Sequence, residues 1–283
     1  MVVTGKTSTG YSIIDPGYLG RTDLSSHGNV FKVAGVVQSV SGDDPGELDF
    51  SIVDTATLLV TAPDGSRTGF DPTTGQVVRD VPQSVYYADS AGTTDDSDQN
   101  SDPPFSTTYS VQSFRPLDGV YVVQVTGLQA GAYQLGIKSF DANGRAQNFV
   151  LKAGIAAPGS VRTLTVQYSS QLGATTTASL SATYASTLED ILNSQQLGLI
   201  DRRGIAASLG RKVERAARAA TQRDFDEALE RLKEFKEEVQ NLSGKHVRGV
   251  ASQVLLDDAN SLISQIPSRR KHDEPDRDRG KDK

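Results

Sequence analysis

The clearest structural signal in the sequence is the segment GVYVVQVT at residues 119–126. Tyr121, Val123 and Val125 occupy every second position, which is the period expected of a strand with one buried face. The segment GAYQLGIKSF at residues 131–140 repeats this alternation. Two consecutive strands of this kind predict a β-domain around them.

Further strand-like runs lie on both sides and are separated by turn sequences such as PDGS, DPTTG and DANG, in which Asp-Gly or Asn-Gly supplies the backbone freedom of a tight turn. These runs cover residues 58–62, 67–70, 76–78, 107–114, 147–152 and 162–168. About eight short strands, spaced roughly 8–12 residues apart, predict an all-β, Ig-like sandwich. We place this sandwich at residues 45–170.

The apolar period becomes helical after a Ser/Thr/Ala-rich segment, residues 171–186, which we expect to be a linker. Apolar stripes then predict one short and three long helices over residues 187–266, packed as an antiparallel bundle. The sequence TLED at 187–190 resembles a capping box, Asp224 is expected to cap a second helix start, and Ser243-Gly244 a helix end. Residues 267–283 are densely charged, and we expect disorder there.

The predicted fold class is therefore α+β multidomain, with a short β segment, the sandwich and the helical bundle in that order. The 283 residues suffice for such cores, and the hydrophobic content of 36% is diluted by polar loops and the tail. Residues 41–160 hold fifteen acidic and six basic residues, an acidic body that argues against a nucleic-acid partner. With no cysteine, the chain has no disulfides, thiolate metal sites or cysteine nucleophile of its own.

The sequence contains no transmembrane segment, since no run approaches about 18 consecutive apolar residues. Its first residues do not follow the pattern of a signal peptide, in which a basic region precedes an apolar one. We therefore expect that export, if it occurs, depends on sequence upstream of Met1.

The N-terminal segments VVTGK at residues 2–6 and YSIIDPG at 11–17 resemble the end of a papain-like cysteine peptidase domain of the bacteriocin-processing type. The resemblance implies that Asp15 corresponds to the Asp that orients the catalytic His. It also implies that the His falls just before Met1 and the nucleophilic Cys further upstream. We therefore expect residues 1–40 to be the truncated C-terminal strands of such a domain, with no functional catalytic residue.

The helical segment closely resembles the FIMAH domain, a module at the C-termini of secreted bacterial proteins. The residues that carry this resemblance are LGLID at 197–201, GIAASL at 204–209, NLSGK at 241–245 and DDAN at 257–260. The sandwich, through residues 64–75 and 119–127, resembles accessory sandwiches that follow catalytic or adhesive domains in secreted bacterial proteins. Together the resemblances imply an extracellular or cell-surface location and no chemistry in the FIMAH part.

An acidic insertion supplies the one candidate cofactor site, for calcium. Asp96, Asp98 and Asn100 match the first three ligand positions of a calcium-binding loop, whereas Ser101 replaces the glycine of position six and Thr107 the glutamate of position twelve. A solvated acidic loop is the alternative interpretation. No other cofactor is expected.

Other candidate residues have structural interpretations. His27 follows Ser25 and Ser26, and together with Asp15 they contain the residue types of a Ser-His-Asp triad, but a simple turn explains them. The three histidines are scattered and form no zinc pattern. Tyr86, Tyr87 and Phe105 flank the acidic insertion; exposed aromatics there can stack on sugar rings, but the absence of tryptophan favours strand core.

The sequence thus indicates a non-enzymatic accessory or targeting region of an extracytoplasmic, peptidase-like bacterial protein. This region would bind the cell envelope or a substrate, or position the protein there, through an unidentified envelope or protein partner. An upstream catalytic domain would lie beside it in the chain. One alternative is half of a split cysteine peptidase that receives Cys and His from another chain. Another is a calcium-stabilised adhesion module.

Overall fold

The computed structural model describes residues 2–6, 11–14, 46–53, 55–91 and 106–267. The chain divides into two compact units, residues 1–41 and 42–283. In the first unit, β1 (Val2–Lys6) and β2 (Tyr11–Ile14) pair as an antiparallel hairpin, which confirms the strands predicted there. Asp15, Ser25, Ser26 and His27 lie outside the described residues.

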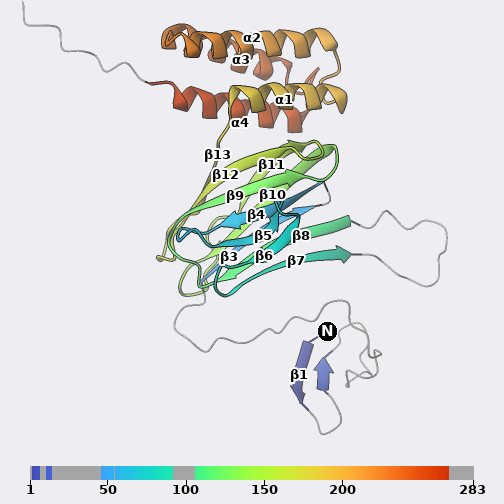
Figure 1. Cartoon of the computed structure of the whole chain (residues 1–283), viewed down its shortest axis with the longest axis vertical. Helices are drawn as coiled ribbons and strands as arrows, with labels where there is room; N and C mark the ends of the chain where they lie inside the picture. The colour runs from blue at the N-terminus through green and yellow to red at the C-terminus, as the bar shows by residue number, and fades with distance from the viewer. Residues whose placement is uncertain (1, 7–10, 15–45, 54, 92–105, 268–283) are drawn as a thin grey trace, which may run out of the picture. The chain divides into compact units, whose positions relative to one another are not determined.

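The second unit has the predicted mixed α+β fold, in which a β-sandwich precedes a helical end (Figure 1). One described sheet has the strand order β11-β10-β3-β8-β7 and the other β13-β12-β9-β4-β5-β6, and all pairs are antiparallel. The first sheet comprises β3 (Glu47–Val53), β7 (Ser84–Ala91), β8 (Ser106–Phe114), β10 (Gly131–Phe140) and β11 (Val150–Ala156). The second comprises β4 (Ala56–Thr61), β5 (Arg67–Asp71), β6 (Gln76–Arg79), β9 (Gly119–Gly127), β12 (Val161–Tyr168) and β13 (Thr177–Leu180).

Two of these strands, β3 and β13, were not predicted, and β7 was anticipated only through the interpretation of Tyr86 and Tyr87 as strand core. Strand β3 occupies the middle of its sheet, although its sequence ELDFSIV alternates acidic and apolar residues after a Gly/Asp-rich stretch. Strand β13 is built from the Thr/Ser/Ala-rich sequence that predicted a linker, and it extends the second sheet by pairing with β12. Its backbone pairing with β12 stabilises this strand, although its sequence did not predict one.

The sandwich core lies between the two sheets and consists of the residues at alternate positions of the central strands. Leu48, Phe50 and Ile52 of β3 face Tyr121, Val123 and Val125 of β9 within one buried cluster. Tyr121 also packs edge-on against Tyr168, with ring centroids 6.5 Å apart. Each of these side chains is at most 1% exposed, so truncating one of the aliphatic residues to alanine should cost about 2–5 kcal/mol.

Four helices follow the sandwich: α1 (Tyr184–Gln196), α2 (Arg203–Thr221), α3 (Phe225–Leu242) and α4 (Gly249–Gln265). The predicted cap of α3 is confirmed, because the carboxylate of Asp224 accepts a hydrogen bond from the backbone N–H of Glu227. Ser243 and Gly244 end this helix as predicted, with Gly244 at a φ of 72°. No helix in the described ranges is long and apolar enough to span a membrane.

The cap of the first helix was predicted wrongly. Helix α1 begins three residues before Thr187, and its capping box is formed by Thr183 and Ser186. Thr187 is fully buried and donates its hydroxyl hydrogen to the carbonyl of Thr183, while Asp190 points to a partner outside the helix. A Ser/Thr-rich segment offers several equivalent caps, and tertiary contacts decide among them.

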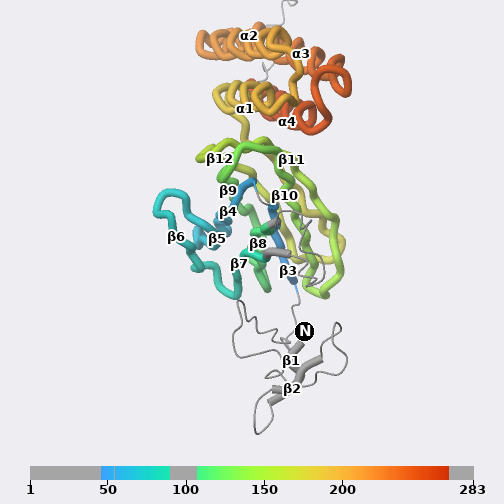
Figure 2. The backbone as a smooth tube through the Cα atoms, turned by 90° about the vertical axis from the view of Figure 1, so that its right-hand side faces the viewer, coloured from blue at the N-terminus to red at the C-terminus, as the bar shows by residue number. Residues whose placement is uncertain are grey.

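The helices cover one side of the sandwich. Helices α1 and α4 contact β11, and α4 also contacts β13; these are the edge strands of the two sheets. Figures 1 and 2 both show α1 and α4 next to the sandwich, with α2 and α3 stacked beyond them. An uncovered edge strand exposes unpaired backbone groups, so this placement protects one edge of each sheet.

Candidate functional sites at the domain junction and on the sheet face

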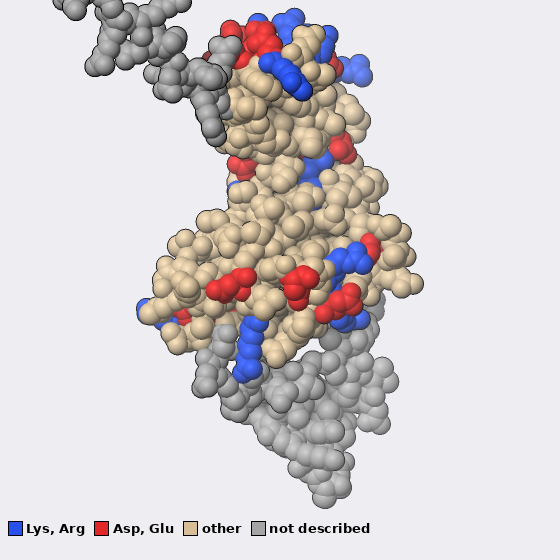
Figure 3. Space-filling model, turned by 60° about the vertical axis from the view of Figure 1, so that its left-hand side comes forward, with Lys and Arg blue, Asp and Glu red and all other residues tan. Residues whose placement is uncertain are grey.

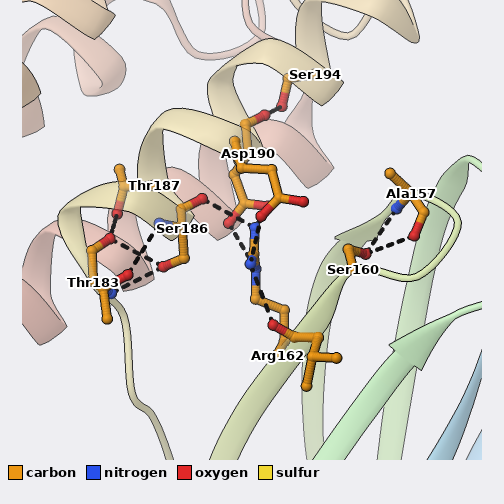
Figure 4. A network of polar contacts seen from close by, with 10 residues as sticks. Ala157, Ser160, Arg162, Thr183, Ser186, Thr187, Asp190 and Ser194 are labelled. Carbon is orange, nitrogen blue, oxygen red and sulfur yellow. Dashed lines mark hydrogen bonds and ion pairs between the residues drawn. The ribbon is translucent and has the colours of Figure 1, made fainter. Parts of the chain in front are cut away.

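A buried arginine connects the sandwich to the helices (Figure 4). Arg162 lies on β12 at the same parity as the core residues Leu164 and Val166, so its side chain enters the inner side of the sheet. Its guanidinium forms a two-pronged ion pair with Asp190 of α1, with Nη2–Oδ1 at 2.6 Å and Nε–Oδ2 at 3.2 Å. The Arg162 and Asp190 side chains are only 8% and 1% exposed. Such a desolvated bidentate pair fixes geometry more strictly than a surface ion pair.

The first two turns of α1 supply further acceptors for Arg162. Nη2 also donates to the carbonyl of Ser186 at 3.0 Å, and Nη1 donates to Glu189 at 3.2 Å. Ser186 is held in place by the capping box, since its backbone N–H donates to Thr183 Oγ1 and its hydroxyl accepts from the Thr183 N–H. The start of the helix is therefore a preformed acceptor site for the arginine.

A second aspartate adjoins this pair. Asp258 of α4 is fully buried against the Asp190 carboxylate and the Thr187 hydroxyl, and it has no ion-pair partner among the described residues. Burial, followed by the neighbouring Asp190 carboxylate, raises the pKa of Asp258 well above its usual range. Burial also raises the pKa of Asp190, although Arg162 opposes that shift. The junction therefore favours a charged Arg162, an ionised Asp190 and a neutral Asp258.

Apolar and hydrogen-bonded contacts surround this charged cluster. Ile155 of β11 is 1% exposed and belongs to the same buried cluster as Ile191 of α1 and Leu255 of α4. Ser261 of α4 donates to the carbonyl of Leu180 at 2.8 Å at the end of β13. The sandwich and the helices consequently share a core.

A shallow groove of about 290 Å³ lies on the outer face of the five-stranded sheet. Its polar lining consists of Asp49 and Ser51 of β3, Tyr87 and Asp89 of β7, Thr108, Ser110 and Gln112 of β8, and Lys138 of β10. This lining combines hydrogen-bond donors and acceptors with one exposed aromatic ring, which is the composition of a site for a polar ligand.

Asp49 is the least satisfied group in this groove. Its Oδ1 atom is buried and has no hydrogen-bond partner among the described residues. Burial, together with the charge of Glu47, raises the pKa of Asp49 to about 7, and Lys138 opposes the shift. Glu47 itself accepts a hydrogen bond from Gln112 Nε2. The carboxyl group of Asp49 thus lines the groove with its Oδ1 atom closed to solvent, beside the carboxyl group of Glu47.

The structure describes some of the residues predicted as sites and leaves others outside the described ranges. Asp96, Asp98 and Asn100, the candidate calcium ligands, lie outside the described residues, as does Phe105. Tyr86 is 8% exposed and bonds Thr57 in the core, as expected of strand core, whereas Tyr87 is 37% exposed at the groove.

His246 lies just before α4, with its Nδ1 atom 2.9 Å from Oδ2 of Asp201. Within the described ranges, no group of three or more His, Asp and Glu residues could hold a metal ion. The space-filling view in Figure 3 shows acidic and basic side chains interspersed on the sandwich rather than a basic face.

Sequence reasoning missed the junction cluster. Two features of the sequence could have indicated it, because a charge on a buried face requires a partner. One is the arginine at a core-facing position of β12, and the other is the aspartate in the apolar stripe of α4. Which residues pair cannot be read from one sequence, because Arg162 and Asp190 are brought together only by docking of the two domains.

Comparisons with known proteins identify the helical part. Residues 185–264 match the model of the FIMAH domain, which confirms the resemblance seen in the sequence. No curated protein matches the chain. One matched solved structure is that of astrotactin-2, described as a conserved vertebrate-specific and perforin-like membrane protein involved in neuronal development. It is 12% identical over 81% of this chain and 36% of that chain, and with a TM-score of 0.14 it carries no argument.

Proposed function

We propose that this chain is a non-catalytic accessory region that binds or positions a larger protein at the cell envelope or at its substrate. The observation that carries the proposal is the combination of a sandwich and a FIMAH domain in one compact unit that has an open polar groove on one sheet face. The shared core and the Arg162–Asp190 pair would hold the groove at a fixed orientation to the helices. A fixed binding surface raises the effective concentration of whatever is tethered to it.

Retention on envelope material tests this function. The full chain should be retained by insoluble cell-envelope fractions and released by excess soluble envelope polymer. A chain of similar charge, such as a scrambled-surface control protein, should pass through. If no envelope fraction retains the chain, the positioning function is wrong.

Attachment to a peptidase-like domain is a further part of this proposal, supported by the resemblance of residues 2–17. The split-peptidase alternative can be separated from it by co-expression with the upstream reading frame and a thiol-reactive peptide probe. Labelling that does not depend on Asp15 would contradict the split peptidase. Calcium binding by Asp96, Asp98 and Asn100 also stays a prediction, and calorimetry with millimolar Ca²⁺, the range of weak extracellular sites, would decide it.

A further inference from the structure

We propose that the groove on the five-stranded sheet binds a neutral oligosaccharide. This inference rests on the proposed binding function and names the chemistry of its ligand.

The register shows why a trough exists at this position. Ser51 of β3 pairs with Gly136 of β10 on one side and with Ser110 of β8 on the other, and Ser110 pairs with Tyr87 of β7. The next row along the strands carries the larger side chains Lys138, Asp49 and Gln112. The small residues Ser51 and Ser110, beside this larger row, form a channel across β3 and β8. With strands about 4.8 Å apart, the whole row from β7 to β10 is about 14 Å long, enough for a chain of rings rather than a single ring.

Aromatic rings lie at both ends of this row. Tyr87 on β7 is 37% exposed at the groove. Beyond Ser51, the ring of Phe149 lies over Gly136, where an added Cβ would come within 3.4 Å of the ring, and Phe149 is 58% exposed. Sugar rings present flat C–H faces that pack on such rings while their hydroxyls reach the polar lining.

The hydrogen-bonding groups suit hydroxyl groups of a ligand. The hydroxyls of Ser51, Thr108 and Ser110 can each donate and accept, and Lys138 is a donor in the row beside them, next to Asp49. Among the lining residues, Lys138 balances Asp89, and Asp49 is about half protonated near neutral pH because its pKa is about 7. A lining with little net charge and both bonding directions favours a neutral polyhydroxylated ligand over an ion.

The place of the groove argues against an extended peptide. A peptide strand is recognised through backbone hydrogen bonds at a sheet edge. The groove instead lies on the face of the sheet and crosses the strands, where the backbone groups of β3 and β8 are already paired with each other. Side chains alone must therefore bind the ligand, as a saccharide requires.

Titration of the full chain with the neutral hexasaccharides cellohexaose, hexa-N-acetylchitohexaose and mannohexaose, followed by calorimetry and saturation-transfer NMR, tests the inference. At least one hexasaccharide should bind, and Tyr87→Ala and Asp49→Ala should each weaken it at least about tenfold. The matched control Val120→Ala removes a 48% exposed strand residue from the six-stranded sheet and should leave binding unchanged. Circular dichroism and thermal melts should show that all three variants are folded.

Binding by none of the three hexasaccharides, or binding indifferent to both groove variants, would overturn the inference. Preferential binding of an extended peptide in the groove would overturn it as well. Envelope retention distinguishes failure of this inference from failure of the proposed function. If envelope fractions retain the wild type and Tyr87→Ala equally, the positioning function holds and saccharide binding in the groove does not explain it. Hexasaccharide binding without retention would instead sustain the groove and refute the envelope role.

Discussion

Arg162 is the residue on which the junction depends most. Its removal would leave Asp190 buried beside Asp258 without the cation that pairs with it in the described part of the chain. Truncating one partner of a buried ion pair typically costs about 3–5 kcal/mol, because the remaining charge stays desolvated. We therefore expect Arg162→Ala to lower the free energy of unfolding by about that amount, measured by urea denaturation.

Two comparisons make this prediction specific. Arg231→Ala removes an arginine that pairs with Glu227 and Glu234 on the solvent side of α3, and it should change stability far less. Replacing all three junction groups together, with Arg162→Met, Asp190→Leu and Asp258→Leu, should recover most of the loss, since a buried ion pair and an apolar set of similar volume are often nearly equivalent. A single Arg162→Ala variant as stable as the wild type would contradict the network.

Asp258 should make stability depend on pH in an unusual direction for an aspartate. Because the folded state raises its pKa, that state holds a proton which the unfolded chain has already released above about pH 4. Its contribution to stability is therefore present at low pH and is lost as pH rises toward the folded-state pKa.

The Asp258→Asn variant replaces the neutral carboxyl with a group of the same shape and no charge. At about pH 8 it should be more stable than the wild type, and the difference should shrink toward about pH 4. Urea denaturation across this range measures both curves. A wild-type advantage that grows with pH would show that Asp258 is ionised and stabilised in the folded protein.

At the scale of elements, α1 depends on a cap that the sequence did not reveal. Thr183→Ala removes the side chain that accepts from the Ser186 N–H, and this should cost about 1 kcal/mol. Thr221→Ala, which removes a hydroxyl bonded only to a carbonyl in the last turn of α2, is the control and should have a much smaller effect. Chemical denaturation of both variants measures the difference; equal losses would place the cap elsewhere.

The elements divide into those that local pattern predicts and those that pairing creates. Strands β9 and β10 and helices α2 and α3 were predicted because their apolar periods match the faces they bury. Strand β13 was not, since its two apolar residues, Ala178 and Leu180, are too few to give a strand period, and its backbone is held by pairing with β12 and by Ser261 of α4. The groove could not be predicted for the same reason. Ser51, Ser110 and Tyr87 lie far apart in the sequence and become neighbours only through the register of the strands.

At the scale of the whole molecule, the sandwich and the helices should unfold as one. Ile155 on β11 contributes to the helical core, and Ser261 on α4 bonds the end of β13. Differential scanning calorimetry should therefore show a single transition for these two parts. The Arg162→Ala/Ile155→Ala double variant should separate it into two, because both the charged and the apolar links are then weakened. Two transitions in the wild type would contradict a shared core.

The buried pair also restricts how these domains can be exchanged during evolution. Asp190 belongs to the helical domain, whereas the arginine that compensates it belongs to the sandwich. A recombination event that joined these helices to another sandwich would leave a desolvated carboxylate unless the new host supplied a cation at the corresponding strand position. A helical domain with a buried aspartate at position 190 therefore requires a sandwich with a cation at position 162. Substitutions at these two positions should covary among descendants.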